Sequence, residues 1–184
     1  MAGSNQLINA VALTLYTGMR RNELFTLEWS DVDLEAGLIH VRAKNTKTKR
    51  GRTLPLSEDA NAVVIACSTY RAKHCPESKW VICSHEGERF KDLKRSFKTA
   101  KKLAGISGFR WHDMRHTFAA WLVTAGVPLA EVRDLLGHRS VKETERYAHL
   151  APENLRSAVQ HLPNLSHVQV TLTDSNGESN AVSH

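Results

Sequence analysis

The segment from Trp111 to Leu150 limits the possible folds most, because it reads as a compact unit of short helices. Over residues 112–124, apolar side chains recur at spacings of three and four. This periodicity predicts a helix whose buried face comprises Met114, Phe118, Trp121 and Leu122. Gly126 ends this helix, and an apolar stripe over residues 129–136 predicts a second one, which Gly137 closes.

A third short helix is expected to carry Tyr147. Ser140 and Glu143 have the spacing of a capping box, in which a serine and a glutamate three residues later satisfy the backbone at a helix start. By pattern alone, the segment is a helical unit that carries two histidines, an arginine and a tyrosine. These four residues are His112, Arg115, His138 and Tyr147.

The chain before this unit combines helices with a long β-hairpin. Residues 7–16 and 20–27 predict two helices, and alternation over residues 38–41 and 53–56 predicts two strands. Between the strands, residues 42–52 contain six basic side chains and no acid. Such a run is usually a solvated loop, but on a hairpin it can equally lie along a phosphate backbone.

Three further elements precede the helical unit. Ser57 caps a helix that runs to residue 73, and residues 80–83 read as a short apolar strand. Residues 90–103 predict an amphipathic helix whose inner face is Phe90, Leu93, Phe97 and Ala100. Its outer face holds six bases against one acid, Asp92, which favours phosphate contact over a merely solubilising face. The bases are Lys91, Lys94, Arg95, Lys98, Lys101 and Lys102.

The predicted fold class is α+β, mainly α-helical with a small antiparallel β-sheet or hairpin. A last helix is expected over residues 152–161, and residues 167–173 alternate as an isolated strand. We therefore expect one domain over residues 1–163 and a C-terminal tail over residues 164–184. The strand of this tail would add to a sheet edge in the same or a neighbouring subunit, and the last residues would be disordered.

Composition favours an anionic partner. The 184 residues carry a net charge of +6, and residues 151–184 hold one arginine against three acids, so the first 150 residues hold +8. This balance favours nucleic acid first and a membrane surface second. The three cysteines lack zinc-knuckle spacing, and no apolar run approaches the ~20 residues of a membrane-spanning helix. Reduced thiols, no metal and a cytoplasmic location are expected.

Five motifs together resemble the catalytic domain of tyrosine recombinases of the phage integrase type. They are TGMRRNEL around Arg20, KTKRGRTLPLS, HDMRHTFAAWL, LLGH and ERYAH. Each motif is weak alone, but they occur in the family's order over residues 7–160, with His138 and Tyr147 at the family's spacing. The resemblance implies that family's fold and the position of a C-terminal catalytic domain.

The resemblance also implies a role for each matching residue in DNA strand transfer through a 3′-phosphotyrosine. Arg20 and Arg115 resemble the arginines that clamp the scissile phosphate, because a guanidinium fork matches a phosphate and keeps its proton. His138 resembles the third donor to this phosphate. Tyr147 resembles the nucleophile, and the field of two arginines is expected to favour its phenolate. His112 would be the general base or its positioner.

A lysine on the hairpin would protonate the leaving 5′ oxygen. In the family it precedes a proline of the second strand by eight residues, which from Pro55 points to Lys47, with Lys44 and Lys49 as alternatives. Glu23 resembles the acid that supports the first arginine, although its spacing alone indicates an ordinary surface ion pair.

His116 is expected to be structural rather than reactive. No metal and no cofactor are implied, because a phosphotyrosine retains the energy of the phosphodiester and rejoining then needs neither ATP nor metal. The bases expected to contact DNA are Lys44, Lys49, Arg50, Arg52, Lys94, Arg95, Lys98 and Lys101.

The implied partner is double-stranded DNA, bound by a homotetramer in which strand 167–173 packs on a neighbouring subunit. Accessory DNA-bending proteins belong to the same expectation, as does integration and excision of a prophage or mobile element in a bacterial or phage setting. The isolated domain is expected to be monomeric. It is also expected to bind DNA weakly, because the family's preceding DNA-binding domain is not among these residues.

Three other functions are compatible with parts of the chain. Residues 125–147 read as the supporting helix, turn and recognition helix of a non-catalytic helix-turn-helix regulator. That interpretation leaves Arg20 and the basic hairpin unexplained. An inactive integrase remnant would keep the fold without the activity, although the full set of motifs argues against decay. Type IB topoisomerase chemistry would use all the same residues.

Overall fold

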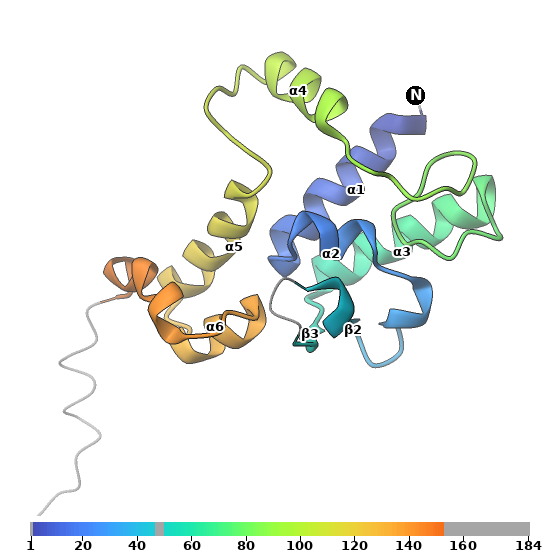
Figure 1. The fold of residues 1–184 in the computed structure, drawn as a ribbon. Coiled ribbons are helices and arrows are strands. Elements are labelled where there is room, and N and C mark those ends of the chain that lie inside the picture. Colours follow the sequence, from blue (N-terminus) through green and yellow to red (C-terminus); the bar gives the residue numbers. More distant parts are fainter. Residues whose placement is uncertain (1, 47–49, 153–184) are drawn as a thin grey trace, which may run out of the picture. The chain divides into compact units, whose positions relative to one another are not determined.

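The structure is a computed structural model that describes residues 2–46 and 50–152 (Figure 1). The α-helices in these residues are α1 (Ala2–Thr17), α2 (Arg21–Phe25), α3 (Glu58–His74), α4 (Lys94–Leu103), α5 (Asp113–Thr124) and α6 (Leu129–Leu136). The strands are β1 (Val32–Asp33), β2 (Leu38–Val41) and β3 (Arg52–Pro55). Short 3-10 helices are η1 (Trp29–Asp31), η2 (Ala43–Asn45), η3 (Val141–Glu143) and η4 (Glu145–Leu150). The predicted fold class is confirmed.

The three strands form one antiparallel sheet in the order β1-β2-β3. Ile39 of β2 lies opposite Leu54 of β3, and both side chains are buried against the helices. The expected hairpin is therefore present, and the strand alternation read from the sequence reflects one buried face. At the far end of the hairpin, Val41 lies opposite Arg52, which brings the first residue of β3 toward α6.

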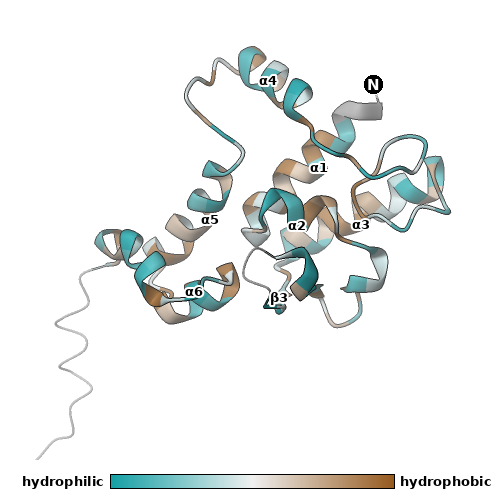
Figure 2. Cartoon of the chain, viewed as in Figure 1, coloured by the Kyte–Doolittle hydropathy of each residue, from teal (hydrophilic) through white to brown (hydrophobic). Residues whose placement is uncertain are grey.

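The buried side chains form two main clusters. The larger joins α1, α2, the sheet and α3, with Leu13, Leu24, Ile39, Leu54 and Val64 among its members. The smaller joins α5, α6 and η4 and includes Phe118, Val132, Leu136 and Tyr147. Figure 2 shows the hydrophobic stretches that α1 and α3 contribute. Because α1 packs on both α3 and α5, it links the two clusters.

Gly18 fixes how the end of α1 meets α5. Its φ is 61°, in the left-handed region that glycine adopts without steric cost. A Cβ at this position would lie 2.5 Å from Cδ1 of Phe118 on α5. The absence of a side chain therefore lets the chain turn directly over α5, which leads Arg20 to the N-terminal half of that helix.

Residues 80–83 are not a strand, contrary to the prediction. The segment forms only isolated bridges, Glu28 with Trp80 and Cys83 with Arg89. One backbone hydrogen bond, from the N–H of Val81 to the carbonyl of Leu27, ties it to the residues that follow α2. Val81, Ile82 and Cys83 are fully buried, so the apolar run reflects burial of an irregular segment rather than strand pairing.

The amphipathic helix begins later than predicted. α4 starts at Lys94, where Asp92 Oδ1 accepts a hydrogen bond of 3.1 Å from the backbone N–H of Lys94. Phe90 and Leu93 pack on the core from the segment before the helix. Ala100, expected to face inward, is exposed, and none of the α4 residues is buried.

Two details of the C-terminal helical unit also differ from expectation. Trp121 is 54% exposed rather than part of the buried stripe of α5, which is formed by Met114, Phe118, Ala119 and Val123. The third helix consists of the 3-10 helices η3 and η4, and Glu143 Oε1 accepts from the N–H of Arg139 rather than from Ser140. The stripe and the capping pattern were thus only partly correct.

Several expectations lie outside the described residues. They concern Lys47 and Lys49, the helix over residues 152–161 apart from its first residue, strand 167–173 and the domain boundary at residue 163. Of the helices described, none has the length and hydropathy that crossing a bilayer requires.

Candidate active site

One cavity of about 490 Å³ gathers most of the residues expected to be catalytic. Its lining comes from the residue that precedes α2, from the N-terminal part of α5 with its cap, and from the segment that runs from the end of α6 into η4. Arg20, His112, Arg115, His138 and Tyr147 all line it. The other lining residues are His116, Arg139, Glu143 and Arg146.

Glu23 binds two arginines, Arg20, which lines this cavity, and Arg52, which does not. Its side chain is fully buried, accepts from Arg20 Nη1 at 3.1 Å and Arg52 Nη2 at 2.8 Å, and also accepts from the backbone N–H of Arg20 at 2.9 Å. Burial alone would raise the pKa of Glu23, but hydrogen bonds and charge from Arg52 and Arg20 lower it below its usual value. Glu23 is therefore an ionised, buried support for Arg20 rather than half of an ordinary surface pair.

Arg52 lies inside the protein, with a side chain that is 8% exposed. Besides binding Glu23, it donates from Nε to the backbone carbonyl of Leu135 at 2.8 Å. This burial contradicts the expectation that Arg52 is one of the exposed DNA contacts. Its guanidinium instead connects α2 with the end of α6.

Arg115 ties the end of α1 to the end of α6. Its side chain donates from Nη1 to the carbonyl of Gly18 at 2.6 Å and from Nη2 to the carbonyl of Leu136 at 2.5 Å. Burial and the charges of Arg20 and Arg52 lower the pKa of Arg115 to about 9, so its guanidinium is charged at neutral pH. The guanidinium of Arg115 thus holds together two segments that are far apart in the sequence, at Gly18 and at Leu136.

His138 follows directly on the left-handed Gly137 that ends α6. Its Nδ1 lies 2.8 Å from Oγ1 of Thr144, a fully buried residue. Burial, together with the charge of Arg115, lowers the pKa of His138 to about 4, so the ring is neutral at neutral pH. With Nδ1 bonded to Thr144, Nε2 is the ring nitrogen free to bond elsewhere.

Tyr147 is 7% exposed and packs in the smaller core cluster. Its hydroxyl lies 2.5 Å from Nδ1 of His116. Burial raises the pKa of Tyr147, while the charges of Arg146 and Arg115 oppose this rise. The expected phenolate is therefore not favoured here: burial outweighs the two arginines, and the hydroxyl keeps its proton at neutral pH.

His112 lies at the N-terminus of α5, exposed, with its ring edge-on to that of His116 at 4.8 Å between centroids. Among the described residues the hydroxyl of Tyr147 bonds His116 and not His112. The sequence placed His112 and His116 four residues apart on one helix, which put both near the same site. This spacing could have indicated from the sequence that His116 lies at the same site as His112.

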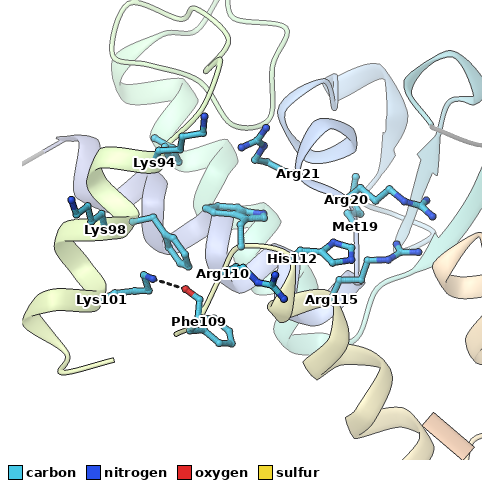
Figure 3. A pocket seen from close by; sticks show the side chains of 13 residues that line it. Met19, Arg20, Arg21, Lys94, Lys98, Lys101, Phe109, Arg110, His112 and Arg115 are labelled. Atoms are coloured by element: carbon cyan, nitrogen blue, oxygen red, sulfur yellow. Dashed lines mark hydrogen bonds between the residues drawn. The ribbon is translucent and has the colours of Figure 1, made fainter. Parts of the chain in front are cut away.

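A second cavity of about 430 Å³ opens from the same place toward α4. Figure 3 shows Arg20 and Arg115 extending in the same direction on one side, with His112 beside them, and the lysines of α4 opposite. Arg20, His112 and Arg115 line both cavities. The positive charge of α4 thus borders a cavity that shares these three lining residues with the candidate site.

The basic residues expected to contact DNA differ in exposure. Lys44, Arg50, Lys94, Arg95 and Lys98 are exposed. Lys101 is partly buried: its Nζ donates to the carbonyl of Phe109 at 2.5 Å and lies 5.5 Å from the centre of the Phe97 ring. In the part of the chain that the structure describes, no group of three or more His, Cys, Asp or Glu side chains is arranged to hold a metal ion.

Comparison with known proteins agrees with this arrangement. A sequence model described as the phage integrase family matches residues 4–154. The chain belongs to this family. It is 30% identical to the integrase of Salmonella phage P22, over 88% of this chain and 46% of that protein. It is 31% identical to the tyrosine recombinase XerA of Saccharolobus solfataricus, over 80% of this chain and 47% of that protein.

Solved structures of the family share the fold. The crystal structure of XerA recombinase has a TM-score of 0.69 at 30% identity, over 87% of this chain and 59% of that one. The catalytic domain of bacteriophage HP1 integrase has a TM-score of 0.65 at 32% identity, over 89% of this chain and 86% of that one. The chain spans about half the length of the curated relatives that it matches.

Proposed function

We propose that this chain is the catalytic domain of a site-specific DNA recombinase that cleaves and rejoins strands through a 3′-phosphotyrosine. The observation that carries the proposal is the cavity in which the hydroxyl-bearing Tyr147 lies with Arg20, Arg115 and His138. A nucleophile, two guanidinium groups and a neutral donor in one hollow are suited to transfer of a phosphodiester. Membership of the phage integrase family supports the same reaction class.

Arg20 and Arg115 would bind the non-bridging oxygens of the scissile phosphate. Each Nη of Arg115 has a second N–H beyond the one that bonds a backbone carbonyl. Arg20 is held by its ion pair with the buried Glu23. Nε2 of His138 would add a third donor. Because such donors act on charge that develops in the transition state, removal of one should cost roughly 3–4 kcal/mol of transition-state stabilisation.

Tyr147 would attack the phosphorus, and a protonated lysine would supply the proton to the leaving 5′ oxygen. The family pattern points to Lys47 for this lysine, with Lys44 and Lys49 as alternatives. The phosphotyrosine conserves the energy of the broken bond, so a 5′-hydroxyl of another strand can reverse the step. Because the bond energy is retained, the strands can be rejoined, whereas hydrolysis would lose that energy.

The DNA backbone would lie across Lys44, Lys49, Arg50, Lys94, Arg95, Lys98 and Lys101, without Arg52. The cavity toward α4 supports this path, because the exposed bases of α4 border the same hollow as Arg20 and Arg115. The helix-turn-helix alternative lacks support: its recognition helix would fall on η3 and η4, which are 3-10 helices of three and six residues.

The wider biological role follows the same proposal. The catalytic domain would extend over residues 1–163, and strand 167–173 of the tail would pack on a neighbouring subunit of a tetramer assembled on DNA. Integration and excision of a prophage or mobile element, with accessory DNA-bending proteins, would take place in the bacterial cytoplasm. The isolated domain would be a monomer with weak affinity for DNA.

The reaction can be tested with nicked duplexes whose sequence around the nick is randomised, so that no target site is assumed. Cleavage beside the nick releases a short fragment and traps the covalent intermediate. We expect an SDS-resistant protein–DNA adduct with the parent chain and none with Tyr147→Phe. No adduct with either chain from the whole pool would contradict the proposal, and an equal yield from both would contradict the choice of nucleophile.

The DNA path can be tested by the salt dependence of binding. We expect the double substitution Lys94→Gln and Lys98→Gln to lower the slope of log K against log salt by about 2, because each phosphate contact contributes about 0.9. Lys73→Gln with Lys79→Gln is the matched control, since both are exposed lysines away from the cavity. Equal slopes for the two double variants would place the DNA elsewhere.

A further inference from the structure

We propose that the cavity between α4 and the start of α5 binds a small planar aromatic anion, a ring system that carries one sulfonate, carboxylate or phosphate group. The cavity volume is about 430 Å³. Small-molecule sites span about 300–1,000 Å³. Of the residues that line this cavity, only Arg20, His112 and Arg115 also line the candidate active site. Binding itself does not rest on the proposed function, whereas its expected effect on DNA cleavage does.

Three aromatic rings lie in a row along this cavity. The ring centre of Phe97 lies 5.2 Å from that of Trp111 and 6.5 Å from that of Phe109. All three residues line the cavity, and each is only partly buried. Partly exposed rings in a concave site offer a surface on which another planar ring can stack. The row of rings therefore favours a flat aromatic ligand.

The indole N–H of Trp111 indicates that the ligand carries an acceptor. Its Nε1 is buried and has no hydrogen-bond partner in the part of the chain that the structure describes. A buried donor without an acceptor costs free energy, so most such groups in folded proteins are paired. An oxygen atom of a ligand stacked beside Trp111 would supply the acceptor.

The charge around these rings is entirely positive. Of the described residues that line the cavity, seven are arginine or lysine and none is aspartate or glutamate. Arg21 and Lys98 are exposed, and neither forms an ion pair within the described residues. Figure 3 shows the lysines of α4 on one side of the cavity and Arg20 and Arg21 on the other. This field attracts an anion and would hold its charged group while the ring stacks.

The combination of rings and cations favours a small ligand over duplex DNA in this cavity. The bases of a duplex stay stacked inside the helix, so duplex DNA offers its phosphates to the cations and leaves Phe97, Phe109 and Trp111 without a partner. A free aromatic anion brings both a ring and a charge. Nucleoside monophosphates and non-nucleotide aromatic acids both belong to this class.

NMR signals of the tryptophan indole N–H groups report binding directly. The chain has four tryptophans, and Trp111→Phe assigns the signal of Trp111. We expect naphthalene-1-sulfonate and deoxyadenosine monophosphate to shift this signal, with a Kd of about 1 mM or tighter for the better probe. The tighter of the two identifies the source as a non-nucleotide acid or a nucleotide. Sulfate, which lacks the ring, and 1-naphthalenemethanol, which lacks the charge, should bind at least about fivefold more weakly.

Matched variants test which side chains bind the probe. We expect Arg21→Gln with Lys98→Gln to weaken the better probe about fivefold or more, whereas Lys73→Gln with Lys79→Gln stays within about twofold. Phe109→Leu should weaken it about threefold or more, whereas Phe90→Leu, outside the cavity, should not. A shift confined to Trp29, Trp80 or Trp121, equal affinity for sulfate, or equal affinities of the cavity and control variants would overturn the inference.

The bound ligand should also slow the proposed reaction. Because it would lie against Arg20 and Arg115, the better probe should lower the rate of adduct formation on the randomised nicked duplexes, and more DNA should restore the rate. An unchanged rate at a saturating probe concentration would overturn this competition. Absence of an adduct without the probe would contradict the proposed function alone, since the NMR titration contains no DNA.

Discussion

Arg52 Nη2 donates a hydrogen bond of 2.8 Å to Glu23 Oε2, and both side chains are buried. The pair joins α2, which carries Glu23, to the first residue of β3, and Arg52 continues to the carbonyl of Leu135 in α6. Arg20 is held by the same carboxylate. Arg20, which would contact the phosphate, is thus positioned by the buried ion pairs that Glu23 makes inside the domain.

Breaking this network should destabilise the fold. We expect Arg52→Ala to lower the free energy of unfolding by about 3–5 kcal/mol, because it leaves the buried carboxylate of Glu23 without its main partner. Urea denaturation measures the change. Arg50→Ala, an exposed arginine two residues earlier, should stay within about 0.5 kcal/mol of the parent. Equal losses for the two variants would contradict a structural role for Arg52.

The close approach of α1 and α5 should make Gly18 intolerant of a side chain. We expect Gly18→Ala to cost about 1–3 kcal/mol from its clash with Phe118, in addition to about 1–2 kcal/mol for the left-handed backbone. Gly126→Ala is the control, because Gly126 also has a positive φ but its Cβ would meet no atom within 4 Å. Thermal or urea unfolding should show the larger loss at Gly18; a loss no larger than at Gly126 would refute the steric argument.

Thr144 should fix the proton of His138 on Nε2. Its buried hydroxyl donates to Nδ1 in this arrangement, and Thr144→Val removes the donor with little change in shape. We expect Thr144→Val to slow adduct formation about tenfold or more and to cost about 1–3 kcal/mol of stability through the unpaired Nδ1. Thr144→Ser, which keeps the hydroxyl, should stay near the parent. A Thr144→Val chain with the parent rate and Nε2 still protonated would exclude this role.

Acid should weaken the fold partly through His138. An unfolded histidine titrates near 6.5, whereas burial and the charge of Arg115 lower the pKa of His138 in the fold to about 4. Between these values the unfolded chain binds a proton that the native chain does not, so stability should fall as pH drops from about 6.5 to about 4. His112 and His116 add a change of the same sign.

Urea unfolding across this pH range should show a shallower decline for His138→Gln than for the parent. The same substitution at the exposed His149 gives the reference slope. A decline in His138→Gln as steep as in the parent would mean that His138 is not protonated preferentially in the unfolded chain.

The sequence predicted the elements whose pattern depends on one buried face. The periodicity of α5 and α6 and the alternation of β2 and β3 reflect burial in two clusters, which local spacing records. The family motifs predicted that Arg20, Arg115, His138 and Tyr147 share one site, and all four line the same cavity.

Contacts between distant segments could not be read from the sequence. Arg52 looked like one more base of an exposed hairpin, because nothing local showed that Glu23 and the carbonyl of Leu135 would enclose it. The direction of the Tyr147 pKa shift depended on burial against α5, which outweighs the nearby arginines. The apolar run at residues 80–83 resembled a strand because burial produces the same composition with or without pairing.

Whether Tyr147 carries the bond to DNA is tested most directly by mapping the adduct. The trapped complex would be digested with nuclease and protease, and the peptide that retains a nucleotide would be sequenced by mass spectrometry. We predict a nucleotide joined through its 3′ phosphate to the peptide containing Tyr147. A nucleotide on Tyr16, Tyr70 or any other residue, or no nucleotide-bearing peptide at all, would contradict the assignment.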